Sequence, residues 1–347
     1  MAELPGRPLG GVRGPFAGFE RFKVLDFTKL LPGPYATQML RDLGCRVTKV
    51  ELPHFPDGAR AAPPLVDGVG SLYWMVNQGK AELSLDFRKP EGLAEARRLV
   101  AEADVLVEGF RPGLMDRVGL GCDAALALNP RLVYCSLVGY PTHGPWRRKA
   151  GHDLNFQAVS GLLGLGAPEE RPTFPATQTA DLSGAMAAVT AVLAALLERE
   201  ATGKGRRVEV AMAEAAHSLL PVPLAERRAG AADPDGRGRW WDGTHPFYRL
   251  YRAADGGWLA VAALEKPFAL SLLDALGLQA LAPLADDPAA NAAALSAALE
   301  ASFGSAGAAA WVERLKGKDV CVTRVNRLGE AGAFMDWLRS APESPAP

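Results

Sequence analysis

Three side chains that can transfer protons stand where helices are expected to begin. His152 and Asp153 directly precede the helical run "LNFQAVSG", and Asp181 precedes the long apolar run "LSGAMAAVTAVLAALLERE". Each has an ordinary explanation, since aspartates often cap helices by accepting backbone N–H bonds and a histidine at such a junction is usually structural. The same geometry also supports chemistry, because free N–H groups and the positive end of a helix dipole stabilise a nearby anionic oxygen.

Two reactions fit these residue types. If His152 faced Asp181 across a thioester, one could remove an α-proton while the other donated a proton to the opposite face, which is general acid–base catalysis on a carbon acid. Asp181 could instead attack the thioester and form an anhydride. Glu265, in "ALEKPF", adds a further carboxylate, although beside Lys266 it could be an ordinary surface residue. The residues alone leave these alternatives open.

The composition is that of an ordinary globular protein. With 347 residues, 48% of them apolar and 22% charged, the chain is expected to form one large domain and a smaller one. A net charge of -1 and the lack of any long run of like charge predict no nucleic-acid partner. The cysteines and histidines show no metal-ligand spacing, so no metal is expected. We expect no stretch long enough to span a bilayer, and therefore a cytoplasmic protein with no membrane partner.

Strands and helices alternate along the first half of the chain. Strand-like runs are expected at 22–27, 45–52, 81–87, 104–110 and 131–140, with helical runs in between. The long helix after residue 180 is apolar almost all round and should lie in the core. This order predicts an α/β fold with a doubly wound, Rossmann-like parallel sheet. Ligands of such sheets bind beyond the carboxyl ends of the strands, which directs attention to the loops after Phe27, Phe110 and Tyr140.

Turn signals and composition suggest where the domains end. We predict a large α/β domain over residues 1–205 and a linker over 206–245, whose second half is rich in Gly, Arg and Asp. A smaller α+β domain is expected over 246–315, opened by a hairpin around "AADGG". The remaining segment, 316–347, is expected to return to the large domain.

Seven stretches, in order along the chain, match a known family. They are "VLDFTKLLPGPYATQMLRDLGCRVTKVE", "NQGKAELSLDF", "VLVEGFRPGLMDRVGLG", "AGHDLNFQAVSG", "TADLSGAM", "RRVEVAM" and "FYRLYRAADGGWLAVAALEKPF". Through them, from about Phe22 to about Asn326, the chain resembles the family III coenzyme A transferases, also called the CaiB/BaiF family. This group contains formyl-CoA transferase, carnitine-CoA transferase and α-methylacyl-CoA racemase.

The resemblance implies a role for each candidate residue. Asp181 matches the aspartate that is the nucleophile of the transferases or one of the two proton-transfer residues of the racemase. His152 matches the racemase histidine, and Glu265 matches the glutamate that supports this histidine. Asp153 is then expected to position the loop that carries His152.

The resemblance also implies the ligand and the assembly. An acyl-CoA substrate is expected, held by the large domain, with no cofactor beyond its CoA moiety. The matching basic positions are Lys49, Lys80 and Arg111, although each could equally be solvated surface. The fold would be that of the family, an interlocked homodimer in which the small domain of one chain closes the site of the other.

Two features favour the racemase branch of the family. Transferase members usually have another residue in place of His152, and many carry a glycine-rich loop that this chain lacks. The expected activity is therefore the interconversion of 2-methylacyl-CoA stereoisomers by two-base α-proton transfer through an enolate. The alternatives are CoA transfer between carboxylic acids through an aspartyl-CoA thioester at Asp181, and a non-catalytic acyl-CoA-binding homologue. Departures from the family pattern at Ala180 and Arg324 motivate the last of these.

Overall fold

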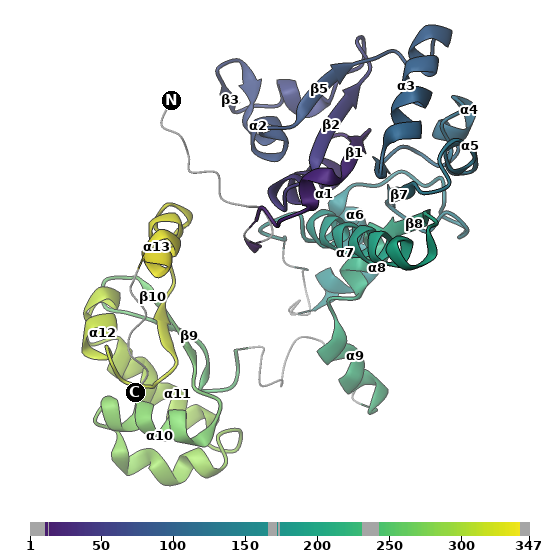
Figure 1. Ribbon diagram of the computed structural model, residues 1–347. Helices are drawn as coiled ribbons and strands as arrows, with labels where there is room; N and C mark the ends of the chain where they lie inside the picture. Colours follow the sequence, from purple (N-terminus) through teal and green to yellow (C-terminus); the bar gives the residue numbers. More distant parts are fainter. Residues whose placement is uncertain (1–10, 13, 166–171, 173, 231–242, 341–347) are drawn as a thin grey trace. The chain divides into compact units, whose positions relative to one another are not determined.

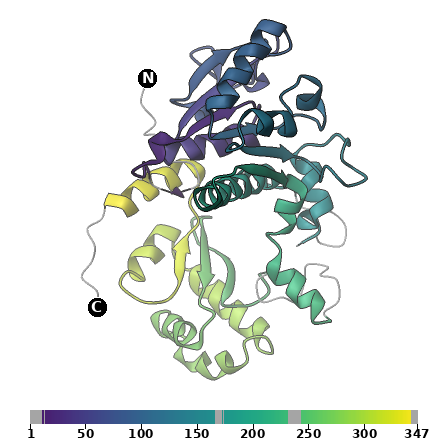
Figure 2. The same ribbon diagram turned by 45° about the vertical axis from the view of Figure 1, so that its right-hand side comes forward.

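The computed structural model describes residues 11–12, 14–165, 172, 174–230 and 243–340. Its contacts divide the chain into two compact units (Figures 1 and 2). The large unit comprises residues 1–165 and 171–233, and the small unit comprises residues 166–170 and 234–347.

A six-stranded parallel sheet forms the centre of the large unit, with the strand order β5-β2-β1-β6-β7-β8 (Figure 1). Its strands are β1 (Lys23–Asp26), β2 (Arg46–Glu51), β5 (Ala81–Ser84), β6 (Val105–Glu108), β7 (Val133–Val138) and β8 (Arg206–Ala211). A separate short hairpin is made by β3 (Leu65–Val66) and β4 (Val69–Gly70). The chain order reverses at β1, from which β2 and β6 extend in opposite directions, so the predicted doubly wound sheet is confirmed.

Helices cover both faces of this sheet. The helices of the large unit are α1 (Pro32–Asp42), α2 (Ser71–Asn77), α3 (Pro90–Glu102), α4 (Leu114–Arg117), α5 (Cys122–Leu128), α6 (Asp153–Ser160), α7 (Thr179–Thr202), α8 (Met212–His217) and α9 (Pro221–Arg228). One core lies between the sheet and α1, α7 and α8, and the other between the sheet and α3 and α5. Successive residues of β1 alternate between them, because Val24 packs into the first core and Leu25 into the second.

Helix α7 runs along the sheet for 24 residues and ends at Gly203, which adopts a left-handed conformation with φ of 72°. It is the one helix of the described residues that is long and apolar enough to cross a membrane, which corrects the expectation that no stretch approaches that length. Small side chains such as Ala185 and Ala188 let it approach α8 and strands β7 and β8 closely. Its apolar side chains therefore pack into the core of the large unit, as its sequence predicts.

The small unit contains a three-stranded antiparallel sheet covered by helices. Its strands, in the order β11-β10-β9, are β9 (Tyr248–Arg252), β10 (Trp258–Ala262) and β11 (Val322–Arg324). Its helices are α10 (Lys266–Ala275), α11 (Ala292–Phe303), α12 (Ala308–Arg314) and α13 (Leu328–Ser340). The predicted hairpin is present, since β9 and β10 pair directly across the "AADGG" turn.

One predicted domain boundary, the start of the linker, needs correction. Residues 206–230, assigned above to a linker, belong to the large unit, because β8 pairs with β7 and α8 packs against α7. Residues 231–242 of the predicted linker lie outside the described residues. Strand β11, in the C-terminal segment, is part of the small sheet. The expected return of this segment to the large domain stays a prediction.

Candidate active site

A cavity of about 550 Å³ opens at the carboxyl ends of the central strands. Its walls come from the loops after β1, β6 and β7, which are the three loops that the sequence singled out, and from the start of α6 and α7. Five basic residues line it: Lys29, Arg111, Arg147, Arg148 and Lys149. We call it the basic cavity.

A second cavity of about 590 Å³ has mainly apolar walls. They are formed by residues of α1, α2, α6 and α7 and of the segments before α1 and α7, including Tyr35, Leu72, Met75, Val76, Leu154, Phe174 and Leu182. We call it the apolar cavity. Leu30, His152 and Asp181 line both cavities and so mark the place where the two meet.

His152 is the N-cap residue of α6 and is exposed. Its own backbone N–H donates to Oδ1 of Asn155 at 3.1 Å, and its carbonyl oxygen accepts from the backbone N–H groups of Asn155 and Phe156. These bonds fix the backbone at the helix start. The imidazole is thereby presented to both cavities from a rigid element.

Asp153 connects the start of α6 to the start of α7. Its Oδ1 accepts the backbone N–H groups of Ala180 at 2.9 Å and of Asp181 at 3.0 Å, and its Oδ2 accepts from the side chain of Gln157 at 2.6 Å. The first turn of α7 is thus capped by a carboxylate from another helix. This arrangement places His152 and Asp181 around the same helix ends.

Asp181 is half-buried, and its environment disfavours a negative charge. Burial, and after it the negative charge of Asp153, raises the pKa of Asp181 to about 7. Within the part of the chain that the structure describes, no side chain donates a hydrogen bond to this carboxylate. A carboxyl group of this kind is near half-protonated at neutral pH, where it can accept a proton or give one away.

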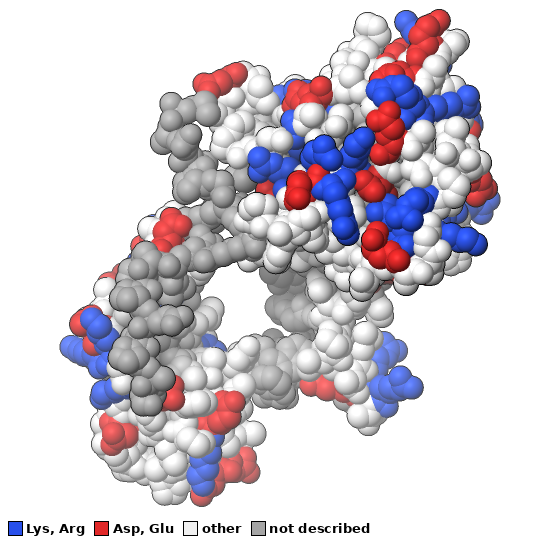
Figure 3. Space-filling model, viewed as in Figure 1, with Lys and Arg blue, Asp and Glu red and all other residues white. Residues whose placement is uncertain are grey.

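Of the three predicted phosphate-binding residues, the structure places only Arg111 at a cavity, where its side chain is exposed. Arg147, Arg148 and Lys149 were missed, although they form a basic run just before the "AGHD" stretch. Figure 3 shows acidic and basic side chains mixed over the visible face of the large unit. The run 147–149 itself contains no acidic residue.

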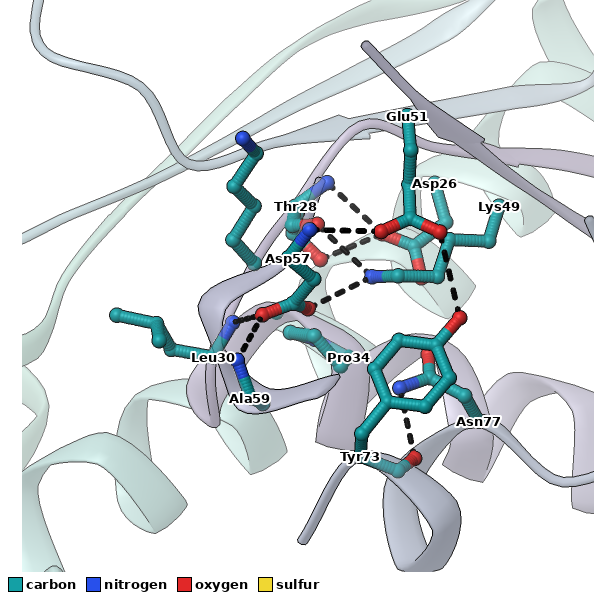
Figure 4. A network of polar contacts seen from close by, with 12 residues as sticks. Asp26, Thr28, Leu30, Pro34, Lys49, Glu51, Asp57, Ala59, Tyr73 and Asn77 are labelled. Atoms are coloured by element: carbon teal, nitrogen blue, oxygen red, sulfur yellow. Dashed lines mark hydrogen bonds and ion pairs between the residues drawn. The ribbon is translucent and has the colours of Figure 1, made fainter. Parts of the chain in front are cut away.

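Lys49 and Lys80 lie inside the large unit and do not line the basic or the apolar cavity. The Lys49 ammonium is 3.1 Å from Oδ2 of Asp57, with both side chains fully buried (Figure 4). That of Lys80 donates to Oδ2 of Asp26 at 3.0 Å and to Oγ1 of Thr37 at 2.8 Å. A phosphate could reach neither, so the binding role expected of these two lysines does not fit their positions.

The buried ion pairs also shift the protonation of their members. Burial lowers the pKa of Lys80 to about 8 in spite of the nearby Asp26. Burial opposes the charge of Asp26 as well, but Lys80, Lys49 and two threonine hydroxyls hold the pKa of this carboxyl well below its usual range. These buried charges therefore stabilise the end of β1 and the loop that follows it.

Glu265 lies in the small unit, where it is exposed at the N-cap position of α10. The structure therefore does not bring it together with His152 within one unit. Its expected support of the histidine stays a prediction.

Comparisons with known proteins agree with this architecture. The model of CoA-transferase family III matches residues 19–339. The α-methylacyl-CoA racemase of Homo sapiens is 33% identical over 312 residues, covering 87% of this chain and 76% of the racemase. The acetyl-CoA:oxalate CoA-transferase of Acetobacter aceti is 34% identical over 316 residues, covering 87% and 78% of the two chains. A solved CAIB/BAIF family protein from Brucella suis is 31% identical with a TM-score of 0.78, covering 91% of this chain and 85% of its own.

A doubly wound sheet with these relatives defines an enzyme of the class that comprises acyl-CoA racemases and CoA-transferases. The chain belongs to CoA-transferase family III, which confirms the resemblance inferred from its motifs.

Proposed function

We propose that the protein is a racemase of 2-methylacyl-CoA thioesters that works with two bases, His152 and Asp181. The observation that carries this proposal is that both side chains line both cavities. An α-carbon held where the cavities meet would have a proton donor and a proton acceptor within reach. Two-base exchange needs such a pair, whereas transfer through an aspartyl thioester needs the aspartate alone.

The mechanism uses the helix ends as well as the two bases. An α-proton next to a thioester is too weakly acidic for histidine or aspartate unless the enolate oxygen is stabilised. The backbone N–H groups of Asp153 and Leu154, in the first turn of α6, have no acceptor among the described residues. We propose that they face this oxygen, where the positive end of the helix adds to the effect.

The protonation of Asp181 supports the same reaction. With its pKa raised to about 7, this carboxyl group is present in both its protonated and its ionised form at neutral pH, so it can give or accept a proton. One base then removes the α-proton, and the other gives its proton to the opposite face. The product leaves the enzyme with the proton on the other residue, and exchange with solvent restores the pair.

The two cavities suggest how the substrate lies. We propose that Arg111 and the run 147–149 bind the phosphates of CoA in the basic cavity, since guanidinium and ammonium groups suit phosphate oxygens. The acyl chain would then lie in the apolar cavity, whose walls need no polar partner. The thioester falls between them, at His152 and Asp181.

The second candidate is CoA transfer between carboxylates, with Asp181 as the nucleophile. Its support is that the relatives include several CoA-transferases, among them the succinyl-CoA:glutarate CoA-transferase of Mus musculus, 32% identical over 281 residues. A nucleophilic carboxylate must be ionised, and a pKa of about 7 leaves only part of Asp181 in that form at neutral pH. This route makes no use of His152.

One experiment separates the candidates. The protein is incubated in heavy water with a 2-methylacyl-CoA, with and without a free carboxylate acceptor, and α-deuteration is followed by mass spectrometry. We expect deuterium uptake without acceptor, a loss of about 10²–10⁴-fold in His152→Ala, and a similar loss in Asp181→Asn. A new acyl-CoA formed only with acceptor, and unaffected by His152→Ala, would establish the transferase instead. Binding without either reaction would indicate a non-catalytic homologue.

Assembly and compartment are further proposals that rest on the family resemblance. We propose a cytoplasmic homodimer in which Glu265 of the small unit orients His152. Sedimentation equilibrium of the full chain tests the dimer directly.

A further inference from the structure

Leu30 occupies the junction of the two cavities together with the two proposed bases. Among the residues that the structure describes, it is one of three that line both cavities, and it is 47% exposed. Unlike His152 and Asp181, it brings no polar group to this place. A ligand that extends from the basic cavity into the apolar cavity would lie beside its isobutyl group.

The backbone of Leu30 is held in an unfavourable conformation. Its φ of 67° lies in the left-handed region, which residues with a Cβ rarely adopt. Such a conformation persists only where the surroundings impose it, and it often marks a functional position. The Leu30 N–H donates to Oδ1 of Asp57 at 2.9 Å, which accounts for part of that constraint.

A buried ion pair completes the constraint (Figure 4). The second oxygen of Asp57 is 3.1 Å from the ammonium of Lys49, which also donates to the carbonyl oxygen of Thr28 at 3.0 Å. Lys49 and Asp57 thus bind the turn at Thr28 and at Leu30 itself. Both side chains are fully buried, so water does not compete with these contacts.

We propose that Leu30 is a specificity-determining residue, whose side chain limits the size of the substituent on the carbon next to the thioester carbonyl. The Lys49–Asp57 pair acts as a positioning device, because it fixes the turn without reaching either cavity. This proposal rests on the proposed function insofar as it takes an acyl-CoA as the ligand. Beyond that function, it states that the protein selects its substrate by the size of the α-substituent and that Leu30 makes this selection.

The test uses two unreactive ligands, S-(2-methylbutyl)-CoA and S-(2-ethylbutyl)-CoA, which differ by one methylene at the branching carbon. Dissociation constants are measured by calorimetry for the wild type and for Leu30→Ala, which keeps the backbone restriction of leucine. We expect the wild type to bind the ethyl-branched thioether more weakly, and Leu30→Ala to reduce that preference about tenfold. Leu72→Ala is the matched control, since Leu72 lines only the apolar cavity, and it should weaken both ligands alike.

A second variant tests the positioning device. Asp57→Asn keeps an acceptor for the Leu30 N–H but leaves the Lys49 charge without its partner, so we expect it to reduce the preference as Leu30→Ala does. If Leu30→Ala kept the preference for the methyl-branched ligand unchanged, the proposed role of Leu30 would be overturned. If Asp57→Asn kept it unchanged, the proposed role of the Lys49–Asp57 ion pair would be overturned. Failure of the wild type to bind either thioether would refute the proposed acyl-CoA function itself, which is a distinguishable result.

Discussion

The carboxylates of Asp153 and Asp181 both lie at the start of α7. Only that of Asp153 accepts hydrogen bonds from the backbone N–H groups there. Asp153 accepts the two N–H groups at the start of α7, so the charge of Asp181 has neither a cap interaction nor a side-chain donor among the described residues. An aspartate that only capped its helix would be stabilised as an anion. Asp181 is in the opposite situation, and this has a consequence for stability.

We expect Asp181 to destabilise the folded protein at neutral and alkaline pH. Its pKa is about 7 in the folded state and near 3.8 otherwise, so between these values the folded state binds more protons than the unfolded state. The free energy of unfolding therefore falls as the pH rises through this range. Asp181→Asn should be more stable than the wild type by about 2 kcal/mol at pH 8, and the gain should shrink as the pH falls toward 4.

Urea unfolding at several pH values measures this difference. Asp123→Asn is a suitable control, because Asp123 is an exposed aspartate in the first turn of α5. It should show no gain at pH 8. If Asp181→Asn were less stable than the wild type across the whole range, the raised pKa would be refuted.

Single residues also show where prediction from sequence stops. The candidate bases could be found because their types and helix-start positions are local features of the chain. The burial of Lys49 and Lys80 could not, because their partners Asp57 and Asp26 are brought to them by the fold. A lysine at a strand end has the same sequence signature whether it faces a phosphate or a buried carboxylate.

At the scale of elements, the start of α1 sets the shape of the loop that carries Leu30. Gly33 stands in the first turn of α1, and a Cβ there would fall 2.2 Å from Cβ of Thr28. Thr28 cannot yield easily, since its Oγ1 donates to Oδ1 of Asp26 at 2.5 Å. The helix can therefore begin this close to β1 only with glycine at this position.

We expect Gly33→Ala to lower the free energy of unfolding by about 1–3 kcal/mol, as for other cases of overpacking. Gly164→Ala is the control, because a Cβ at Gly164 has nothing within 4 Å and its φ is not positive. Chemical denaturation of the two variants and the wild type gives the comparison. Equal stability of Gly33→Ala and Gly164→Ala would show that the loop adapts without cost.

Individual strands and helices were easier to predict from the sequence than their assignment to the two units. The runs that became β1, β6 and β7 are almost wholly buried, and such strands produce continuous apolar stretches that are easy to recognise. The run "GKGRRVEVAM" predicts strand β8, but the predicted domain boundary was placed before it, at residue 206. This strand lies at the sheet edge, with exposed Arg206 and Arg207. Only the pairing with β7 reveals that the large unit continues through it.

At the scale of the whole molecule, the residues proposed for catalysis belong to two different units. His152 and Asp181 belong to the large unit, while Glu265 belongs to the small one. If the small unit of one chain serves the large unit of its partner, two inactive variants should complement each other. We therefore predict that chains with Asp181→Asn and chains with Glu265→Ala, each inactive alone, regain activity when they are co-expressed.

The expected recovery is quantitative. With equal amounts of both chains, about half of the dimers are mixed, and one of the two sites in each mixed dimer combines an intact Asp181 with an intact Glu265. Racemisation should return to about a quarter of the wild-type rate. If Glu265 instead serves its own chain, every site in a mixed dimer carries one substitution and no activity returns. Co-expression of Asp181→Asn with His152→Ala is the control, because both residues lie in the large unit and no mixed dimer then contains a complete site.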